Sequence, residues 1–266
     1  MDSITTKSIK RAIKYVSLLL IIFFPSCASA PLKPAQAIVC PTPNNQVLTN
    51  LVPAMPRHNV CHIVGPGETL WRIGKMYDVK VEDIMSANNL HKNSVIIMGQ
   101  QLAIPNAAPV RPVIPLYDSD KWKYIIIHHS ATDEGDAFSF YNIHLKRGFW
   151  NGLGYDFVID NGTNDRDAGQ IEISPRWIKQ QNGAHCKAGG MNEKGIGICL
   201  VGNFSKENVS DKQMQSLVYL VDILQRYYNI PDQNIMGHGQ VPGAATECPG
   251  DKFPWQTFWE KLRSKK

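Results

Sequence analysis

Four prolines stand within residues 105–115, which read PNAAPVRPVIP. Proline lacks a backbone N–H and fixes φ, so it is excluded from helix interiors and from central strands. Because this segment also lacks a hydrophobic period, it is predicted to separate two folded modules. A stretch rich in Pro, Asn and Thr precedes the first module in the same way. Two linkers, 28–59 and 106–120, are therefore expected around a small module, 60–105, and before a larger one, 121–266.

The first residues, 1–27, have the pattern of an export signal. Basic side chains precede an apolar run at 16–24, which is too short to span a membrane and suits the core of a secretory signal. Two cleavage alternatives remain open. Residues 28–30 (ASA) are typical of a signal peptidase site, whereas residues 24–27 (FPSC) resemble a bacterial lipobox, at which Cys27 is lipidated. We favour a lipoprotein anchored in a membrane and facing the periplasm, in the outer membrane of a Gram-negative host; the alternative is a secreted soluble protein.

The formal charge of +5 is concentrated in the same segment. Residues 1–26 hold four basic side chains and one aspartate, a net charge of +3, which leaves only +2 for the remainder. A charge this small gives no basis for nucleic-acid binding.

Export also sets the redox environment of the cysteines. With Cys27 lipidated, five cysteines remain, and an odd number cannot all pair. Cys40 and Cys61 could close a disulfide, while Cys186 and Cys199 could either pair or stay buried as thiols.

The small module is predicted to have the order βααβ. A strand at 62–64 precedes a helix that begins near Thr69, and a second short helix precedes a strand at 101–104. Its sequence, GETLWRIGKMYDVKVEDIMSANNL followed by GQQLAIP, resembles the LysM module. That resemblance implies binding to N-acetylglucosamine chains of peptidoglycan or chitin. Trp71 has two alternatives, core packing, which is the commoner role for such a residue, and stacking on a sugar.

The larger module is predicted to be α/β, with a mixed central β-sheet flanked by helices. Buried strands are expected at 124–127, 156–159 and 195–201, with a tight hairpin turn at Asn161-Gly162. Three helices are expected: one at 138–146, one that begins at a capping box whose first residue is Ser210, and one at 255–262. Strands that alternate with helices favour this fold class.

Three side chains in this module could bind zinc. His128 ends the first strand, and His238 and Cys248 lie in HGQVPGAATECPG, which is too rich in Gly, Ala and Pro for a helix or strand. A catalytic zinc accepts two imidazoles and one thiolate and leaves one position open. His129 rivals His128, but adjacent strand residues face opposite ways, so only one can point into the site. The spacing alone does not decide the matter, because it matches neither HExxH nor paired CxxC.

The motifs IIIHHSAT, GLGYDFVIDNGT, GAHC, NEKGIGICLVGNF and GHGQVPGAATECPG together resemble the N-acetylmuramoyl-L-alanine amidase type 2 family, which includes the peptidoglycan recognition proteins. The resemblance implies that His128, His238 and Cys248 bind Zn²⁺. It further implies that Tyr155 holds the attacking water, that Thr246 faces the scissile carbonyl, and that His185 lines the substrate groove.

The sequence therefore predicts a zinc-dependent amidase that cuts the bond between the lactyl group of N-acetylmuramic acid and L-alanine. Its expected partners are peptidoglycan, held through both modules, and a membrane, reached through the lipid on Cys27. A monomer is expected. The alternative is a non-catalytic lipoprotein that binds peptidoglycan.

Overall fold

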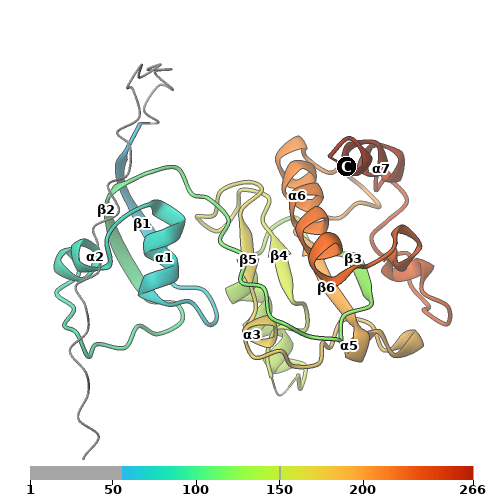
Figure 1. The fold of residues 1–266 in the computed structure, drawn as a ribbon, viewed down its shortest axis with the longest axis horizontal. Helices are drawn as coiled ribbons and strands as arrows, with labels where there is room; N and C mark the ends of the chain where they lie inside the picture. Colours follow the sequence, from blue (N-terminus) through green and yellow to red (C-terminus); the bar gives the residue numbers. More distant parts are fainter. Residues whose placement is uncertain (1–55, 150, 266) are drawn as a thin grey trace, which may run out of the picture. The chain divides into compact units, whose positions relative to one another are not determined.

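The computed structural model describes residues 56–149 and 151–265. The predicted export signal, the lipidation site Cys27, and Cys40 therefore lie outside the described residues. Within the described part of the chain, no helix is both long and apolar enough to cross a membrane. The small module has a two-stranded sheet and the larger module a five-stranded sheet. Both modules are seen in Figure 1.

The small module has the predicted order, β1 (His58–Ile63), α1 (Leu70–Tyr77), α2 (Val81–Ala87) and β2 (Gln101–Ala107). Strands β1 and β2 pair antiparallel. Thr69 begins α1 because its Oγ1 accepts the N–H of Arg72 at 3.2 Å, which satisfies a donor that the helix start leaves free. The fully buried side chains of the core come from both helices and from β2: Ile73, Ile84, Leu102, Ile104 and Ala107.

Trp71 does not belong to this core. Its side chain is 61% exposed, and the ammonium group of Lys75 lies 5.9 Å from the centroid of the indole ring. The core-packing prediction is wrong because Ile73 and Tyr77 occupy the buried face of α1, and Trp71 falls on the other face.

Much of the segment predicted as the second linker, 106–120, packs against folded structure. Ala107 ends β2 and is fully buried, and the N–H of Arg111 donates to the carbonyl of Met76 at 3.0 Å. Further along, the carbonyl of Pro115 accepts the indole N–H of Trp177 at 2.8 Å. The prediction that no strand enters residues 105–115 is wrong at its start, because β2 continues through Pro105 to Ala107, but the rest of the segment forms no helix or strand.

The larger module is built on a sheet of order β5-β4-β6-β3-β7. Its strands are β3 (Tyr124–His129), β4 (Phe157–Ile159), β5 (Ile171–Ile173), β6 (Gly195–Leu200) and β7 (Ile235–Gly237). Only the β4–β5 pair is antiparallel, so the sheet is mixed, as predicted. All six residues of the central strand β6 are buried, which explains why GIGICL lacks the alternation of a half-exposed strand.

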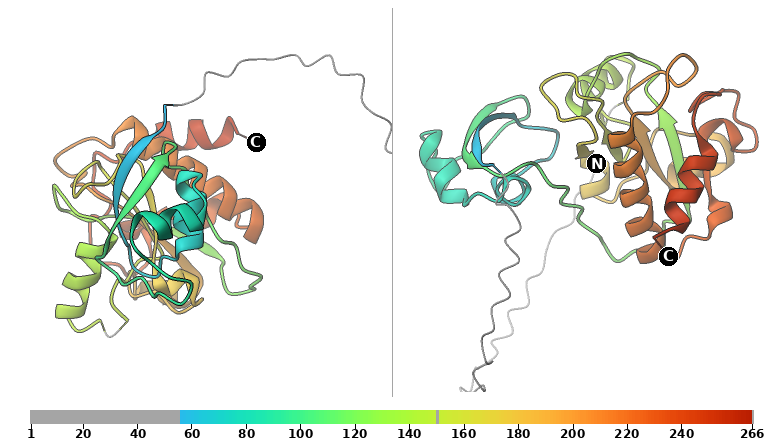
Figure 2. Two further views of the ribbon diagram at one scale, coloured as in Figure 1. Left: turned by 90° about the vertical axis from the view of Figure 1, so that its left-hand side faces the viewer. Right: turned by 90° about the horizontal axis from the view of Figure 1, so that it is seen from above.

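Helices cover both faces of this sheet. They are α3 (Ala137–Lys146), α4 (Pro175–Ile178), α5 (Met191–Lys194), α6 (Asp211–Tyr228) and α7 (Trp255–Arg263). Helices α6 and α7 lie next to each other in Figure 2 and share one apolar core with the side chains of Ile125 and Ile127. Phe140 of α3 and Met191 of α5 belong to two separate, smaller clusters that also include sheet residues.

The tight hairpin predicted at Asn161-Gly162 does not form. Strands β4 and β5 do pair, but residues 160–170 connect them. Asn161 Oδ1 accepts a hydrogen bond from the hydroxyl of Thr163 at 2.7 Å, so the asparagine turns the chain only locally. The loop continues because the buried Arg166 folds back into the interior, 3.2 Å from a carboxylate oxygen of Glu172.

Cys186 and Cys199 are buried free thiols, which decides between the two alternatives for this pair. Cys61 is an exposed thiol. Because Cys40 lies outside the described residues, its disulfide with Cys61 stays a prediction.

Candidate metal centre

The three predicted metal ligands meet at the carboxyl end of β3. The donor atoms of His128, His238 and Cys248 all lie within 4.8 Å of one another. His128 Nδ1 is 3.7 Å from Cys248 Sγ, and the His128 and His238 rings lie 4.7 Å apart between centroids. A tetrahedral zinc ion with its usual bond lengths holds nitrogen and sulfur ligands about 3.6 Å apart. The spacing and the chemistry of these donors therefore fit zinc.

Strand alternation aims His128 at this site. Ile125 and Ile127 of β3 face the core under α6, so His128 lies on the opposite face, where its side chain is 1% exposed. His129 turns the other way, and its Nδ1 accepts the N–H of Phe204 at 3.1 Å. Of the two neighbouring histidines, the structure brings only His128 into the metal cluster.

Two glycines let the other two ligands approach each other. His238 follows Gly237 at the end of β7 and begins a short 3-10 helix. A Cβ atom on Gly237 would collide with Pro249, and one on Gly239 would collide with the carbonyl of Thr246. Without these side chains the segment that carries Cys248 lies directly against the turn that carries His238.

His185 is bonded to His128 instead of being free for a ligand. Its Nε2 lies 3.2 Å from the carbonyl of Gly195, which can only accept, so Nε2 carries the proton. Its Nδ1 lies 3.0 Å from His128 Nε2 and therefore accepts a hydrogen bond from the N–H at that atom. These two hydrogen bonds place the proton of His128 on Nε2, so His128 Nδ1, which faces Cys248, carries no proton. Both ring nitrogens of His185 thus have partners within the chain, and the ring packs where a side chain on Gly197 would stand.

Burial favours the neutral form of every group in the cluster. It lowers the pKa of His128 well below the usual value, with a smaller contribution from the neighbouring histidines, and it lowers the pKa of His238. Burial raises the pKa of the Cys248 thiol to about 12. Neutral imidazoles offer a lone pair to a metal, whereas this thiol needs a cation beside it to ionise.

Tyr155 lies beside the cluster, just before β4. Its ring centroid is 5.2 Å from that of His128, and its hydroxyl is hydrogen-bonded to the side chain of Cys199. Burial, together with the nearby thiols, raises the pKa of Tyr155 well above its usual value. The phenol therefore keeps its proton at neutral pH and can donate it in a hydrogen bond.

Thr246 is exposed on the segment that precedes Cys248. Its Oγ1 accepts the N–H of Cys248 at 3.2 Å, which leaves the hydroxyl proton available to an outside acceptor. The structure thus brings Tyr155, Thr246 and His185 to the same centre as the three metal-binding candidates.

Sequence reasoning missed His144, whose ring lies 5.5 Å from that of Tyr155 between centroids. It occupies the last turn of α3 and is 7% exposed. A polar residue next to the apolar positions of the predicted helix 138–146 was the signal available in the sequence.

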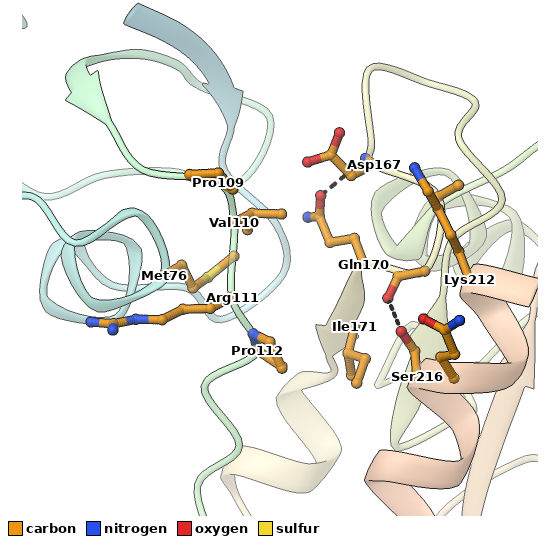
Figure 3. A pocket seen from close by; sticks show the side chains of 13 residues that line it. Met76, Pro109, Val110, Arg111, Pro112, Asp167, Gln170, Ile171, Lys212 and Ser216 are labelled. Carbon is orange, nitrogen blue, oxygen red and sulfur yellow. Dashed lines mark hydrogen bonds between the residues drawn. The ribbon is translucent and has the colours of Figure 1, made fainter. Parts of the chain in front are cut away.

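The predicted site residues do not line the pocket drawn in Figure 3. This pocket has a volume of about 360 Å³, and its lining includes Arg111, Asp167 and Lys212. Figure 3 shows these side chains. Another pocket has a volume of about 770 Å³. Residues 131–135, which come shortly after β3 in the sequence, form part of its lining.

Comparisons with known proteins agree with these features. The model of the N-acetylmuramoyl-L-alanine amidase family matches residues 118–251, and that of the LysM domain matches residues 62–105. The endolysin of Escherichia phage T7 is 33% identical over 147 residues, which are 52% of this chain and 85% of the phage protein. The probable endopeptidase p60 of Listeria monocytogenes is 40% identical over 60 residues, which are 23% of this chain and only 12% of that protein.

Among solved structures, the endolysin and N-acetylmuramoyl-L-alanine amidase LysCS from Clostridium intestinale is similar to this chain, with 33% identity and a TM-score of 0.46. The similarity covers 54% of this chain and 84% of that one. The family match extends over half of the chain and includes His128, Tyr155, His185, His238 and Cys248. The chain therefore belongs to the N-acetylmuramoyl-L-alanine amidase family and also carries a LysM domain.

Proposed function

We propose that this protein is a zinc-dependent amidase that cuts the bond between the lactyl group of N-acetylmuramic acid and L-alanine in peptidoglycan. The observation that carries the proposal is the convergence of His128, His238 and Cys248, whose donor atoms lie within 4.8 Å of one another beside Tyr155. Two imidazole nitrogens and one sulfur are three donors, so the fourth tetrahedral position stays open. This is the arrangement of a catalytic zinc site rather than a structural one.

When bound, zinc supplies Lewis acidity for the scissile carbonyl and activates water for the attack. The chain's own side chains supply orientation. Tyr155 stays protonated and would donate a hydrogen bond to the attacking water in place of its bond with Cys199. Thr246, whose Oγ1 already accepts the N–H of Cys248, would offer its hydroxyl proton to the developing oxyanion. Threonine carries no charge, so it stabilises a developing oxyanion less than a lysine would.

In this proposal His185 orients the metal-binding residue His128 and does not itself bind substrate. Its Nδ1 accepts a hydrogen bond from the N–H at His128 Nε2, which keeps the lone pair of His128 Nδ1 directed at the metal position. Partners of this kind fix the tautomer and the ring angle of a metal-binding histidine.

The bond that is cut distinguishes the proposal from two other functions. Purified full-length protein is incubated with sacculi and the soluble products are analysed by mass spectrometry. We expect free stem peptides that begin with L-alanine. Cuts between amino acids of the stem would instead indicate a peptidase, and an unchanged wall to which the protein binds would indicate a non-catalytic recognition protein.

The LysM domain is proposed to hold the enzyme on glycan strands, with Trp71 stacking on a sugar. Replacing Trp71 by alanine is expected to weaken binding to sacculi about tenfold, the loss of one good contact residue. Because the side chain is 61% exposed, the melting temperature should not change. A pelleting assay and a thermal melt measure the two effects.

Val95 provides the matched control for Trp71, since it is 83% exposed in the same module and is an apolar side chain of ordinary size. Val95→Ala should bind sacculi as the wild type does. Equal binding of Trp71→Ala and the wild type would show that the indole is not part of the glycan site.

The proposed location is the periplasmic side of a membrane, with a lipid on Cys27 and a single chain as the acting unit, because one chain supplies every residue of the site. The support for the anchor is the FPSC pattern at residues 24–27. Labelled palmitate should be incorporated into the wild type and not into Cys27→Ser. Incorporation into neither would favour a secreted soluble product.

A further inference from the structure

We propose that His144 is a positioning residue for Tyr155, acting through the backbone N–H of Gly154; the inference rests on the proposed amidase function. The N–H of Gly154 donates to His144 Nδ1 at 3.0 Å. The His144 ring also lies against the Tyr155 ring, with 5.5 Å between centroids. One imidazole therefore holds both the peptide that precedes the tyrosine and one side of its phenol.

The ring of His144 is held in the protonation state that this contact requires. Burial lowers the pKa of His144 to about 4, with smaller contributions from Arg147 and Arg176. The imidazole is therefore neutral at neutral pH. Since Nδ1 accepts the N–H of Gly154, the proton sits on Nε2.

The position of Gly154 limits that of Tyr155, because both the N–H and the carbonyl of Gly154 are hydrogen-bonded. Its carbonyl accepts the N–H of Ala184 at 2.9 Å, and Ala184 directly precedes His185. A Cβ atom at Gly154 would stand 2.6 Å from the carbonyl oxygen of Ala184, so no side chain fits there. Tyr155 follows this peptide, and its ring centroid is 5.5 Å from that of His144 and 5.2 Å from that of His128.

The helix that carries His144 is itself fixed at its other end. Asp136 caps α3 through the N–H of Ser139 at 2.7 Å, and Glu172 of β5 accepts the N–H of Ala137 at 2.6 Å. Both carboxylates lie near the buried guanidinium of Arg166. At the end that carries His144, the carbonyl of His144 accepts the N–H of Arg147 at 3.1 Å and that of Phe149 at 2.9 Å, so this end of α3 is hydrogen-bonded as well.

The test compares two substitutions of equal shape. His144→Asn keeps an acceptor near the position of Nδ1, whereas His144→Leu has the same branching without an acceptor. We expect His144→Leu to lower kcat for stem-peptide release about tenfold, with KM and zinc content unchanged, the scale of one hydrogen bond. His144→Asn should restore most of that loss. Equal rates in the two variants, or loss of zinc from His144→Leu, would overturn the proposal.

A double-mutant cycle shows whether His144 acts through Tyr155. If it does, His144→Leu should have little further effect on kcat in a Tyr155→Phe background, because the two residues then share one function. An equal tenfold loss in both backgrounds would mean that His144 contributes independently, which contradicts the proposal.

Hydrogen exchange of the Gly154 amide separates this inference from the amidase proposal. With ¹⁵N-glycine labelling, exchange at Gly154 should accelerate at least tenfold in His144→Leu and stay slow in His144→Asn. Unchanged exchange in His144→Leu would refute the hydrogen bond. If the wild-type protein releases no stem peptides, the amidase proposal is refuted. The exchange rate of the Gly154 amide still reports whether His144 accepts its hydrogen bond, because that rate does not depend on turnover.

Discussion

Replacing Cys248 by alanine is expected to abolish zinc binding at the centre and to lower the rate of stem-peptide release by roughly 10³-fold or more. The charge stabilisation that a catalytic metal provides is several kcal/mol, and each 1.36 kcal/mol corresponds to a factor of about ten in rate. Loss of the thiolate leaves His128 and His238 alone, and two neutral nitrogens hold zinc poorly. Metal content after dialysis and the sacculus digest measure the two effects.

Two controls belong with this variant. Cys61→Ser removes an exposed thiol from the LysM domain, so zinc content and release should both stay at the wild-type level. His129→Asn retains an acceptor for the N–H of Phe204 and lies beside the site without pointing into it. If Cys248→Ala kept its zinc, or if His129→Asn lost it, the ligand assignment would be wrong.

Tyr155→Phe is expected to keep zinc and to lower kcat by roughly 10²–10³-fold, the usual loss when one donor to a developing charge is removed. The phenol is no member of the metal-binding set, and its ring still fills the space beside His128. Removing the hydroxyl also takes away the hydrogen bond with Cys199, which should cost the fold about 1 kcal/mol. Single-turnover digestion, metal analysis and a thermal melt record these three effects separately.

Tyr227→Phe is the control for Tyr155→Phe, because Tyr227 is half-exposed on α6 and is not among the residues of the centre. It should release stem peptides at the wild-type rate. Unchanged turnover in Tyr155→Phe would remove the tyrosine from the mechanism, and loss of zinc from that variant would mean that the phenol supports the ligands instead.

Local signals in the sequence predicted most of the helices and strands correctly. Ser210 and Gln213 form the expected capping box at the start of α6, and Asn229 ends that helix in a left-handed conformation. The apolar run before His128 forms a buried strand. These signals suffice because caps and hydrophobic periods depend on residues only a few positions apart.

The prediction at Asn161-Gly162 failed because a distant side chain decides that loop. Arg166 pairs with Glu172 and lies near Asp136, and these buried charges hold the loop away from a two-residue turn. The exposure of Trp71 could not be read from its residue type either, since it depends on which face of α1 the rest of the module covers.

By itself the sequence determined the two modules and most of the longer helices and strands, because these follow from local patterns; it did not predict the short elements β5, β7, α4 and α5. Donor chemistry together with the family resemblance identified the three side chains that could bind one metal ion. The tertiary structure alone decided that the donors of His128, His238 and Cys248 converge, that His185 turns toward His128, and that the His144 ring lies beside that of Tyr155. Each of these relations joins segments from different strands and loops, whose distance is fixed only when the sheet and its helices pack.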